Sequence, residues 1–420
     1  MNGKRIIAID VGSSRITLMA AEVTSAAQVR VFAAEENRKS GISRSGIIEQ
    51  VSGVAFQISE LSKKLRNSLH LEADIYSIYI SVNAKTMKSI SHTITRTFRR
   101  YTEVKFELLE EMEMECRTLF EEDDVEVYEI IPSDYRIDNK RNNDPVGQKC
   151  YSLQATYNVI IGNKKIIENI NRCFDRTGII RQEYVPLSME ALANAVLTQE
   201  ECEDGVALLN FGATTTTLAL YVNGMLENLM VVPRGGYHIT KDIQELGISE
   251  RDAEKLKRLK GVAMEKMVEK AEKIIVAPAH PDNDDVKIAT PFLAHIIEAQ
   301  LDETLLPIFG ELEKNKSKIG AGIVLAGGGS NLNGILEFIQ QRTDMITRFG
   351  DHFDKLTEDT HEAFADPVYA QLIGTCLLID NYLHENPDKI DPAEEKKPKI
   401  GLRKKLAQKF MIFFDDKNDM

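Results

Sequence analysis

The 420-residue chain carries 65 Asp and Glu against 52 Lys and Arg, a formal net charge of -13, and 43% of its residues are hydrophobic. This length predicts two or more domains, and the acidity argues against a nucleic-acid partner. Five scattered cysteines without a CxxC pair argue against a disulfide framework or a zinc site and favour a reducing cytoplasm. Asp10 interrupts the first apolar run, which is therefore too short for the hydrophobic core of a signal peptide. No apolar run is long enough to span a membrane.

A repeated motif opens each half of the chain. The stretch IIAIDVGSSRITLMA, residues 6–20, matches VALLNFGATTTTLAL, residues 206–220, at a constant offset of 200 without a gap. Each copy predicts a buried strand, a tight turn rich in Gly, Ser and Thr, and a second strand. Such turns direct backbone N–H groups and short hydroxyls into a concavity that can cradle phosphate. Two copies at one offset favour a shared function over chance likeness.

Between the two copies the pattern changes twice. Apolar residues at helical spacing in 47–69 predict a helix packed on the first sheet. Residues 84–163 are strand-rich and charged, with one acidic helical stretch, FELLEEMEMECRTLF, and predict an inserted α+β subdomain. A helix containing Ile166, Ile170 and Phe174 then resumes the first lobe. We therefore expect the first lobe to comprise residues 1–83 and 164–200.

The second lobe is predicted at 201–240 and 320–385. Its own insertion, 241–319, is mostly helical, and one apolar stripe there is expected to be core: Phe292, Ile296, Ile297, Leu301, Leu305 and Leu312. The segment AGIVLAGGGSNLNGILEFI, residues 321–339, predicts a strand, a glycine turn and a helix that opens at Asn331. The positive end of such a helix could hold a phosphate or a sugar.

The C-terminal region combines a linker with an unusual tail. Residues 386–399 are rich in proline and charge and predict a flexible linker. Residues 400–414, IGLRKKLAQKFMIFF, contain four cations and no acid. On a helix of about 100° per residue, five apolar residues fall within about 120° of one another, and Ile412 falls outside this arc: Leu402, Leu406, Phe410, Phe413 and Phe414. The residues expected to meet an anionic membrane surface are Leu402, Arg403, Lys404, Lys405, Leu406, Lys409, Phe410, Phe413 and Phe414.

Together these motifs resemble the two-lobed α/β fold of actin, Hsp70 and the sugar kinases, in which ATP lies between the lobes. Four further segments resemble the bacterial cell-division family FtsA: IIPSDYRIDNKRNNDPVG (130–147), VVPRGGYHITKDI (231–243), ERDAEKLKRLKG (250–261) and DPVYAQLIG (366–374). The resemblance covers nearly the whole chain. It implies an actin-like fold with an inserted α+β subdomain and a C-terminal amphipathic helix.

The resemblance also implies a site for ATP and Mg²⁺. The first phosphate loop would be formed by Asp10, Gly12, Ser13 and Ser14, with Asp10 near the metal and its waters. The second would be formed by Gly212, Thr214, Thr215 and Thr216, with Gly236 as its floor. The adenosine side would be lined by Gly327, Gly328, Gly329 and Ser330, with Glu254 and Lys257 on the helix opposite. Without the resemblance, that helix would be interpreted as an ordinary solvated charged face.

The second loop departs from the pattern that this family usually shows, D-I-G-G-G-T-T-D. Asn210 and Thr217 stand at its two aspartates, and Thr214 stands at a glycine. An Asn amide cannot serve as a carboxylate base. The chain is therefore expected to bind ATP and to hydrolyse it slowly at most. Asp10 remains as a candidate catalytic acid, and Glu190 could orient a water if its helix faces the cleft.

The resemblance implies a protein that polymerises with itself and tethers FtsZ to the inner face of the membrane at the division site. The 84–163 subdomain would bind other proteins of the divisome. Two alternatives stay open. A sugar or small-metabolite kinase would need a carboxylate base, against which the second loop argues. A pilus-assembly adaptor of the same fold would not need the linker and amphipathic tail.

Overall fold

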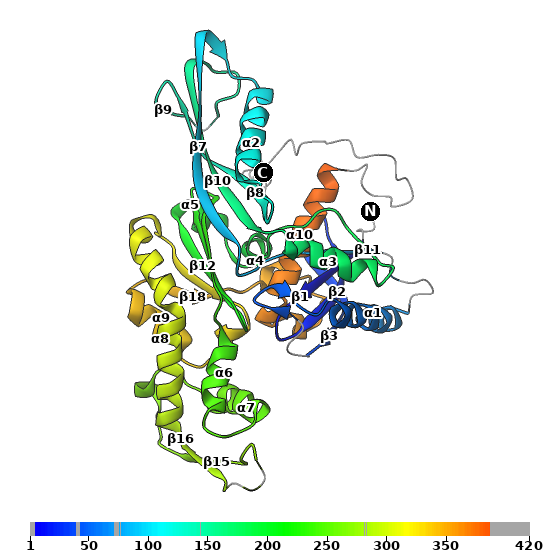
Figure 1. Ribbon diagram of the computed structural model, residues 1–420, viewed down its shortest axis with the longest axis vertical. Coiled ribbons are helices and arrows are strands. Elements are labelled where there is room, and N and C mark those ends of the chain that lie inside the picture. The colour runs from blue at the N-terminus through cyan, green and yellow to red at the C-terminus, as the bar shows by residue number, and fades with distance from the viewer. Residues whose placement is uncertain are drawn as a thin grey trace.

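A computed structural model describes residues 5–38, 43–70, 75, 77–142, 144–280, 282 and 284–386. Figure 1 shows an elongated molecule, with a β-rich arm at one end, a central body, and a helical part at the other end. The predicted linker, apart from Asn386, and the predicted amphipathic helix at 400–414 lie outside the described residues. Within the described ranges, no helix is both long and apolar enough to cross a bilayer.

The first lobe is built on a five-stranded sheet in the order β11-β6-β1-β2-β3. The strands are β1 (Ile6–Val11), β2 (Ile16–Val23), β3 (Val29–Asn37), β6 (Ser77–Ile80) and β11 (Ile180–Arg181). Side chains alternate between the two faces of a strand. Leu18 and Ala20 therefore share a core with α1 (Val51–Ser68), whereas Met19 and Ala21 share one with α10 (Ala370–Glu385). The helix predicted within 47–69 is confirmed.

Smaller elements complete this lobe. A short hairpin pairs β4 (Ser43–Arg44) with β5 (Ile47–Ile48). Three helices follow the insertion: α3 (Lys165–Asp175), α4 (Ser188–Val196) and α5 (Gln199–Asp204). In α3 the predicted apolar positions Ile166, Ile170 and Phe174 are all buried.

The second lobe contributes one end of a nine-stranded sheet, in the order β18-β17-β12-β13-β14-β7-β10-β8-β9. Its own strands are β12 (Val206–Phe211), β13 (Thr216–Val222), β14 (Met225–Val232), β17 (Gly322–Ala326) and β18 (Thr347–Phe349). The pairing of β12 with β13 repeats that of β1 with β2. Asp10 faces Thr17 in the first hairpin, and Asn210 faces Thr217 in the second. The predicted repeat of a strand-turn-strand unit is thus confirmed.

The arm is the inserted segment, and it has a core of its own. It contains β7 (Lys88–Glu103), α2 (Phe106–Phe120), β8 (Val125–Ile137), β9 (Lys140–Arg141) and β10 (Lys149–Asn163). The sequence predicts an α+β insertion in the first lobe. It does not predict that β7 pairs with β14 at Lys88 and Met230, which makes the arm continuous with the sheet of the second lobe.

The helical part opposite the arm contains α6 (Gly236–Gln244), α7 (Glu250–Lys260) and α8 (Thr290–Asn315), with a hairpin of β15 (Lys273–Val276) and β16 (Val286–Ala289). The predicted core stripe of α8 is correct for Ile297, Leu301, Leu305 and Leu312. It is wrong for Phe292, which is 51% exposed. The adjacent Leu293 takes the core position because it is in helical register with Ile297 and Leu301.

The glycine cluster ends differently from the prediction. A 3₁₀ turn at Gly328–Asn331 comes first, and α9 runs over Ile335–Thr343, so the expected helix start at Asn331 is wrong. Gly334 precedes α9 with φ +78°, a left-handed conformation that breaks the helix. The other 3₁₀ turns span Glu265–Met267, Lys316–Lys318, Phe353–Lys355, Glu362–Ala365 and Pro367–Tyr369.

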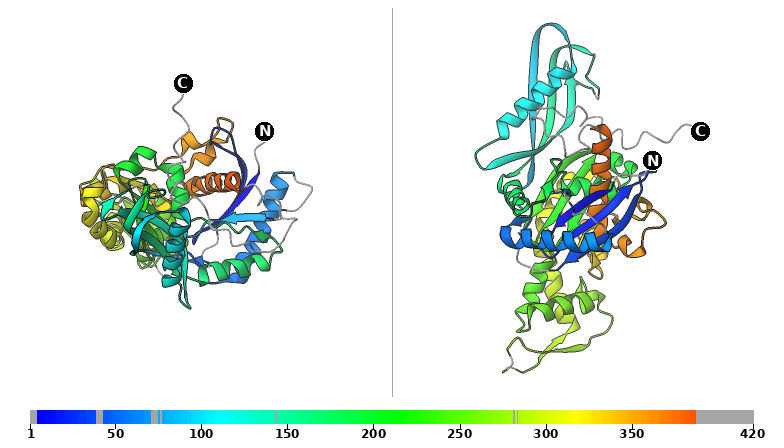
Figure 2. Two further views of the ribbon diagram at one scale, coloured as in Figure 1. Left: turned by 90° about the horizontal axis from the view of Figure 1, so that it is seen from above. Right: turned by 90° about the vertical axis from the view of Figure 1, so that its right-hand side faces the viewer.

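Two helices cross at the centre of the molecule. Figure 2, seen from above, shows α10 between the blue strands of the first lobe and the green and yellow elements of the second. Gly374 of α10 lies against the backbone of α4, where a Cβ atom would stand 1.7 Å from the Ala191 carbonyl oxygen. Only glycine permits this approach of the two helices.

Candidate functional site

The two predicted phosphate loops meet face to face. The Thr214 hydroxyl donates to Ser13 Oγ at 2.7 Å, which joins the second loop directly to the first. The Ser45 backbone N–H donates to Thr214 Oγ1 at 3.0 Å from the β4–β5 hairpin. The structure therefore brings together residues that lie about half the chain apart in sequence.

Glycine is required at the same place in both loops. A Cβ atom on Gly12 would stand 2.9 Å from the Arg15 carbonyl oxygen, and one on Gly212 would stand 2.8 Å from the Thr215 carbonyl oxygen. Each loop folds back on itself so tightly that a side chain would strike the backbone three residues later. The matching contacts show that the sequence repeat is a repeat of loop geometry.

Asp10 lies where the parallel strands β1 and β6 end. Gln371 of α10 donates from Nε2 to Asp10 Oδ1 at 3.0 Å. The same amide lies 3.3 Å from the hydroxyl oxygens of Ser81 and Ser188, which follow β6 and begin α4. A hydrogen-bonded cluster thus links Asp10 to both crossing helices.

Burial raises the pKa of Asp10, and the Arg15 guanidinium and the Gln371 hydrogen bond oppose this rise. Arg15 is itself engaged elsewhere, since its Nη2 donates to the Val368 carbonyl at 3.0 Å and its Nη1 lies 3.6 Å from Glu36. A carboxylate that is desolvated gains free energy when a cation approaches. Asp10 is therefore suited to hold a metal ion or its waters.

The second loop is supported from below by α6. The Gly236 N–H donates to the Gly212 carbonyl at 3.0 Å, and the Tyr237 N–H donates to the Ala213 carbonyl at 2.7 Å. A Cβ on Gly235 would stand 2.4 Å from the Gly212 carbonyl oxygen. These N–H groups at the start of α6 bond the loop itself, so Gly236 lies beneath the loop.

Glu254 and Lys257 bind α7 to the start of α6. Lys257 Nζ donates to the Gly236 carbonyl at 2.8 Å, to Thr240 Oγ1 at 2.8 Å and to Glu254 Oε2 at 2.6 Å. Burial lowers the pKa of Lys257 despite the neighbouring carboxylate. Burial alone would raise the pKa of Glu254, but the Lys257 charge and the hydrogen bonds lower it overall. All three ammonium donors are used, and the pair thereby fixes the floor of the second loop.

The glycine cluster packs against β12. Gly327 has φ +88°, and a Cβ there would stand 2.3 Å from Asn210 Oδ1. A Cβ on Gly329 would meet the Phe211 ring at 2.5 Å. At Gly328 nothing lies within 4 Å, so this glycine alone of the three faces open space. Ser330 is buried and its hydroxyl donates to the Gly327 carbonyl at 2.6 Å.

Glu190 is buried in the first turn of α4, two residues after Ser188. Burial raises the pKa of Tyr221, and the Glu190 charge adds to this rise; the Tyr221 hydroxyl donates to the Met189 carbonyl. Tyr221 pairs with Val206 at the end of β13 that is remote from the second loop. Asp10 has Gln371 as a hydrogen-bond partner.

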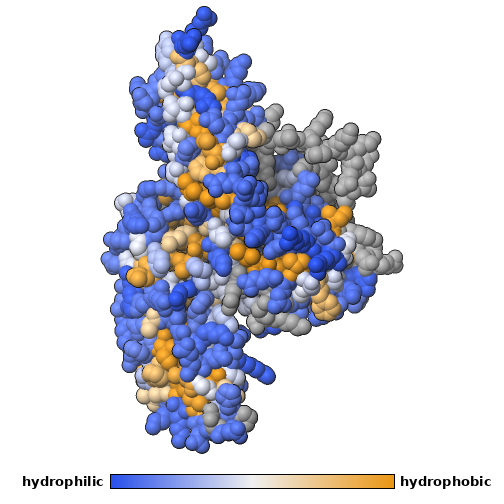
Figure 3. All heavy atoms as spheres, viewed as in Figure 1, coloured by the Kyte–Doolittle hydropathy of each residue, from blue (hydrophilic) through white to orange (hydrophobic). Residues whose placement is uncertain are grey.

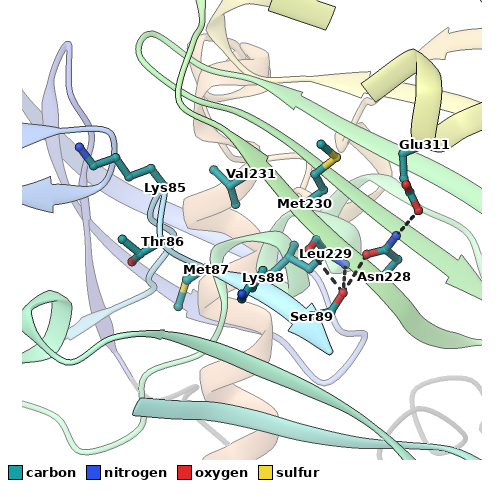
Figure 4. Close-up of a pocket in the computed structure, with 10 residues that line it drawn as sticks. All are labelled: Lys85, Thr86, Met87, Lys88, Ser89, Asn228, Leu229, Met230, Val231 and Glu311. Atoms are coloured by element: carbon teal, nitrogen blue, oxygen red, sulfur yellow. Dashed lines mark hydrogen bonds between the residues drawn. The ribbon is translucent and has the colours of Figure 1, made fainter. Parts of the chain in front are cut away.

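A separate hollow of about 340 Å³ lies where the arm joins the second lobe (Figure 4). The Ser89 hydroxyl donates to Asn228 Oδ1 at 2.8 Å and accepts from the Leu229 N–H at 2.8 Å. Asn228 Nδ2 in turn donates to Glu311 Oε1 of α8 at 2.7 Å. This chain of bonds joins β7, β14 and α8, and no residue of either phosphate loop lines the hollow.

Comparison with known proteins agrees with this architecture. The family profile described as "Cell division protein FtsA" matches residues 207–374. The chain is 26% identical over 383 residues to cell division protein FtsA of Pseudomonas aeruginosa, covering 90% of this chain and 89% of that protein. It is 25% identical over 419 residues to the same protein of Borreliella burgdorferi, covering 99% of both. The chain is therefore similar to FtsA proteins over most of its length.

Solved structures show that this chain has an actin-like fold. A PilM–PilN type IV pilus biogenesis complex matches with a TM-score of 0.63 and 16% identity, covering 89% of this chain and 98% of that chain. MreB5 of Spiroplasma citri bound to ADP matches with a TM-score of 0.52 and 12% identity, covering 91% of this chain and 99% of that chain. At these identities the likeness establishes the fold, and the predicted actin-like class is confirmed.

Three residues of this candidate site were not predicted: Ser45, Asn83 and Gln371. Asn83 Nδ2 donates to Thr217 Oγ1 at 2.7 Å, again between the lobes. Gln371 carried a detectable signal, because it is polar within the apolar run AQLIGTCLLI and buried polar groups need partners. Ser45 and Asn83 carried none, since their partners lie more than 130 residues away and only the fold brings them near.

Proposed function

We propose that this chain binds ATP with Mg²⁺ between its two lobes, polymerises on the inner face of the membrane, and tethers FtsZ there. The observation that supports nucleotide binding is the meeting of two equivalent glycine loops beside one desolvated carboxylate. Similarity to FtsA proteins supports a role in cell division. The ADP-bound MreB5 of the same fold supports the nucleotide class.

The residues present fit a magnesium nucleotide. Gly12 and Gly212 leave the loop backbones bare, so that a phosphate can approach them closely. The nearby hydroxyls would donate hydrogen bonds to the phosphates: those of Ser13, Ser14, Thr214, Thr215 and Thr216. Asn83 Oδ1 and Thr17 Oγ1, next to these loops, are buried without a hydrogen-bond partner among the described residues. Asp10 would hold the metal through its waters, and Gly328 would border the adenosine. Bound Mg²⁺ would supply positive charge at the phosphates.

We infer slow hydrolysis from the second loop. Asn210 stands where the first loop has Asp10, and an amide accepts hydrogen bonds without taking up a proton. Asp10 is the acid that remains in the two loops. The nucleotide would then affect the protein mainly through its binding and release, and its hydrolysis would contribute little.

Membrane attachment is assigned to the tail at 400–414. Each basic residue near an anionic surface contributes about 1 kcal/mol, and each fully buried large apolar side chain roughly 1.5–3 kcal/mol. Ordering a short helix offsets much of this gain, so one tail binds weakly. A polymer that presents many tails binds firmly, because each later contact is intramolecular.

Phe413→Glu is expected to release the protein from anionic vesicles and to leave ATP affinity unchanged, because it places charge in the apolar arc of the tail. Co-sedimentation with vesicles of phosphatidylglycerol measures the first effect, and ATP titration measures the second. Ile412→Glu is the matched control, since this neighbour falls outside the arc, and it should retain most of the binding. Equal release by both variants would show that the tail does not bind as this helix.

The helical part between α6 and α8 is the proposed contact for FtsZ. Its exposed apolar side chains include Leu259, Ile275, Phe292 and Leu306. Figure 3 shows apolar surface over this lower part of the molecule, surrounded by hydrophilic residues. Exposed apolar patches with a polar rim are typical of protein–protein contacts.

A further inference from the structure

Gln371 of α10 contacts the carboxylate that remains in the two phosphate loops. Its Nε2 donates to Asp10 Oδ1 at 3.0 Å. The other carboxylate oxygen, Oδ2, lies 3.7 Å from the position that a Cβ atom on Gly12 would take. One oxygen of Asp10 is therefore bonded to α10, and the other lies beside the first phosphate loop.

The Gln371 amide is itself held by buried hydroxyl groups. Its Nε2 lies 3.3 Å from the Oγ atoms of both Ser81 and Ser188. The hydroxyl of Thr375, one turn further along α10, donates to the Gln371 backbone carbonyl at 2.7 Å and lies 3.3 Å from Ser81 Oγ. All three hydroxyl residues are buried, and buried polar groups need partners. Movement of the amide away from Asp10 would therefore also break its contacts with the two serines.

A neutral amide suits this position because it donates a hydrogen bond without adding charge. A lysine or arginine side chain would also donate, but its charge would neutralise Asp10 and repel a metal ion. The second loop has the neutral Asn210 at the position of Asp10, so it supplies no carboxylate that could make up for a misdirected Asp10. The orientation of this one carboxylate therefore matters more than it would in a site with two.

We propose that Gln371 is a positioning residue for the metal site: it holds Asp10 through Oδ1 so that Oδ2 stays directed toward the first phosphate loop. This inference rests on the proposed binding of ATP with Mg²⁺. Removing a group that holds a metal-binding side chain in place typically lowers metal affinity about ten- to hundredfold. Gln371 thereby makes α10 part of the site, although the helix lies outside both phosphate loops.

Gln371→Met tests this role, because methionine has a similar length and donates no hydrogen bond. The gain in ATP affinity that Mg²⁺ provides should be roughly tenfold smaller in the variant, whereas ATP affinity in EDTA should match that of the wild-type chain. ATP titrations in Mg²⁺ and in EDTA measure both values. An equal gain from Mg²⁺ in the variant and the wild-type chain would overturn the proposal.

Thr375→Val is the matched control, because it removes a hydroxyl from the same cluster and leaves the bond between Gln371 and Asp10 in place. It should lower the urea midpoint and keep the full gain from Mg²⁺. Loss of that gain in Thr375→Val as well would reduce Gln371 to a structural role. Should Gln371→Met fail to fold, Gln371→Ser replaces it, since a serine hydroxyl on a helix bonds its own backbone and would not hold Asp10.

Urea unfolding at neutral pH tests the bond to Asp10 without any nucleotide. Gln371→Met should lower the urea midpoint more in the wild-type chain than in Asp10→Asn, because a hydrogen bond to a charged acceptor is the stronger one. Contacts with the two serines are lost in both chains and cancel. An equal fall would show that Gln371 does not hold the carboxylate. Failure of the wild-type chain to bind ATP would instead overturn the proposed nucleotide site, and the metal role of Gln371 with it.

Discussion

Asp10→Asn is expected to weaken Mg²⁺-dependent ATP binding at least tenfold and to leave the nucleotide-free protein equally or more stable. Asparagine can still accept the hydrogen bond from Gln371, which is 3.0 Å away in the wild-type structure. It lacks the charge that attracts a metal ion, and interactions with a charged group contribute about 1.5–3 kcal/mol. Function and stability should therefore change in opposite directions at this position.

The pH dependence follows from the direction of the pKa shift. Burial raises the pKa of Asp10, so ionising it costs stability at pH values above that raised pKa. The cost disappears as the pH falls below about 4, the ordinary value for this group. The stability advantage of Asp10→Asn should thus be present at pH 7 and vanish toward pH 4.

ATP titration with and without Mg²⁺, and urea unfolding across this pH range, measure the two effects. Asp144→Asn is the control, because this exposed carboxylate of the arm should affect neither. A variant that bound Mg²⁺-ATP like the wild-type chain would remove Asp10 from the metal site.

Gly374→Ala is expected to have the largest effect on stability, at least ~3 kcal/mol of unfolding free energy, with loss of soluble protein. The new Cβ would stand 1.7 Å from the Ala191 carbonyl oxygen, so α10 and α4 must separate. These helices also carry Gln371 and Ser188, which surround Asp10. Whatever folded protein remains should bind ATP more weakly.

Gly310→Ala is the matched control for this change. Gly310 is inside α8, and nothing lies within 4 Å of its missing Cβ. Alanine there should stabilise the protein by about 1 kcal/mol, because glycine is a poor helix former. Urea unfolding of both variants gives the comparison, and a fall of less than 1 kcal/mol for Gly374→Ala would contradict the close helix contact.

The sequence predicted what depends on local pattern. Strand alternation and the offset repeat located both hairpins, and helical spacing located α1, α3 and most of the α8 core. The error at Phe292 arose because neighbouring apolar residues on a helix fit more than one stripe. The predicted helix start at Asn331 was too early, because a glycine turn can continue into a 3₁₀ turn before the helix begins.

Long-range contacts could not be predicted. Asp10 was a candidate from its motif, but its partner Gln371 lies 361 positions away. Glycines in the cluster after β17 looked alike in sequence, yet Gly327 and Gly329 are required by packing on Asn210 and Phe211, and Gly328 is not. Pairing of β7 with β14 depends on how the lobes are placed, which no local pattern encodes.

The most direct test of the proposed tether is the recruitment of FtsZ to anionic vesicles. FtsZ, ATP and vesicles are sedimented with the full chain or with a chain that ends at Lys399, and the FtsZ in the pellet is measured. The proposal predicts that FtsZ pellets with the full chain and stays in the supernatant with the shortened one, although both bind ATP. Equal FtsZ in the two pellets, or none with the full chain, would contradict it.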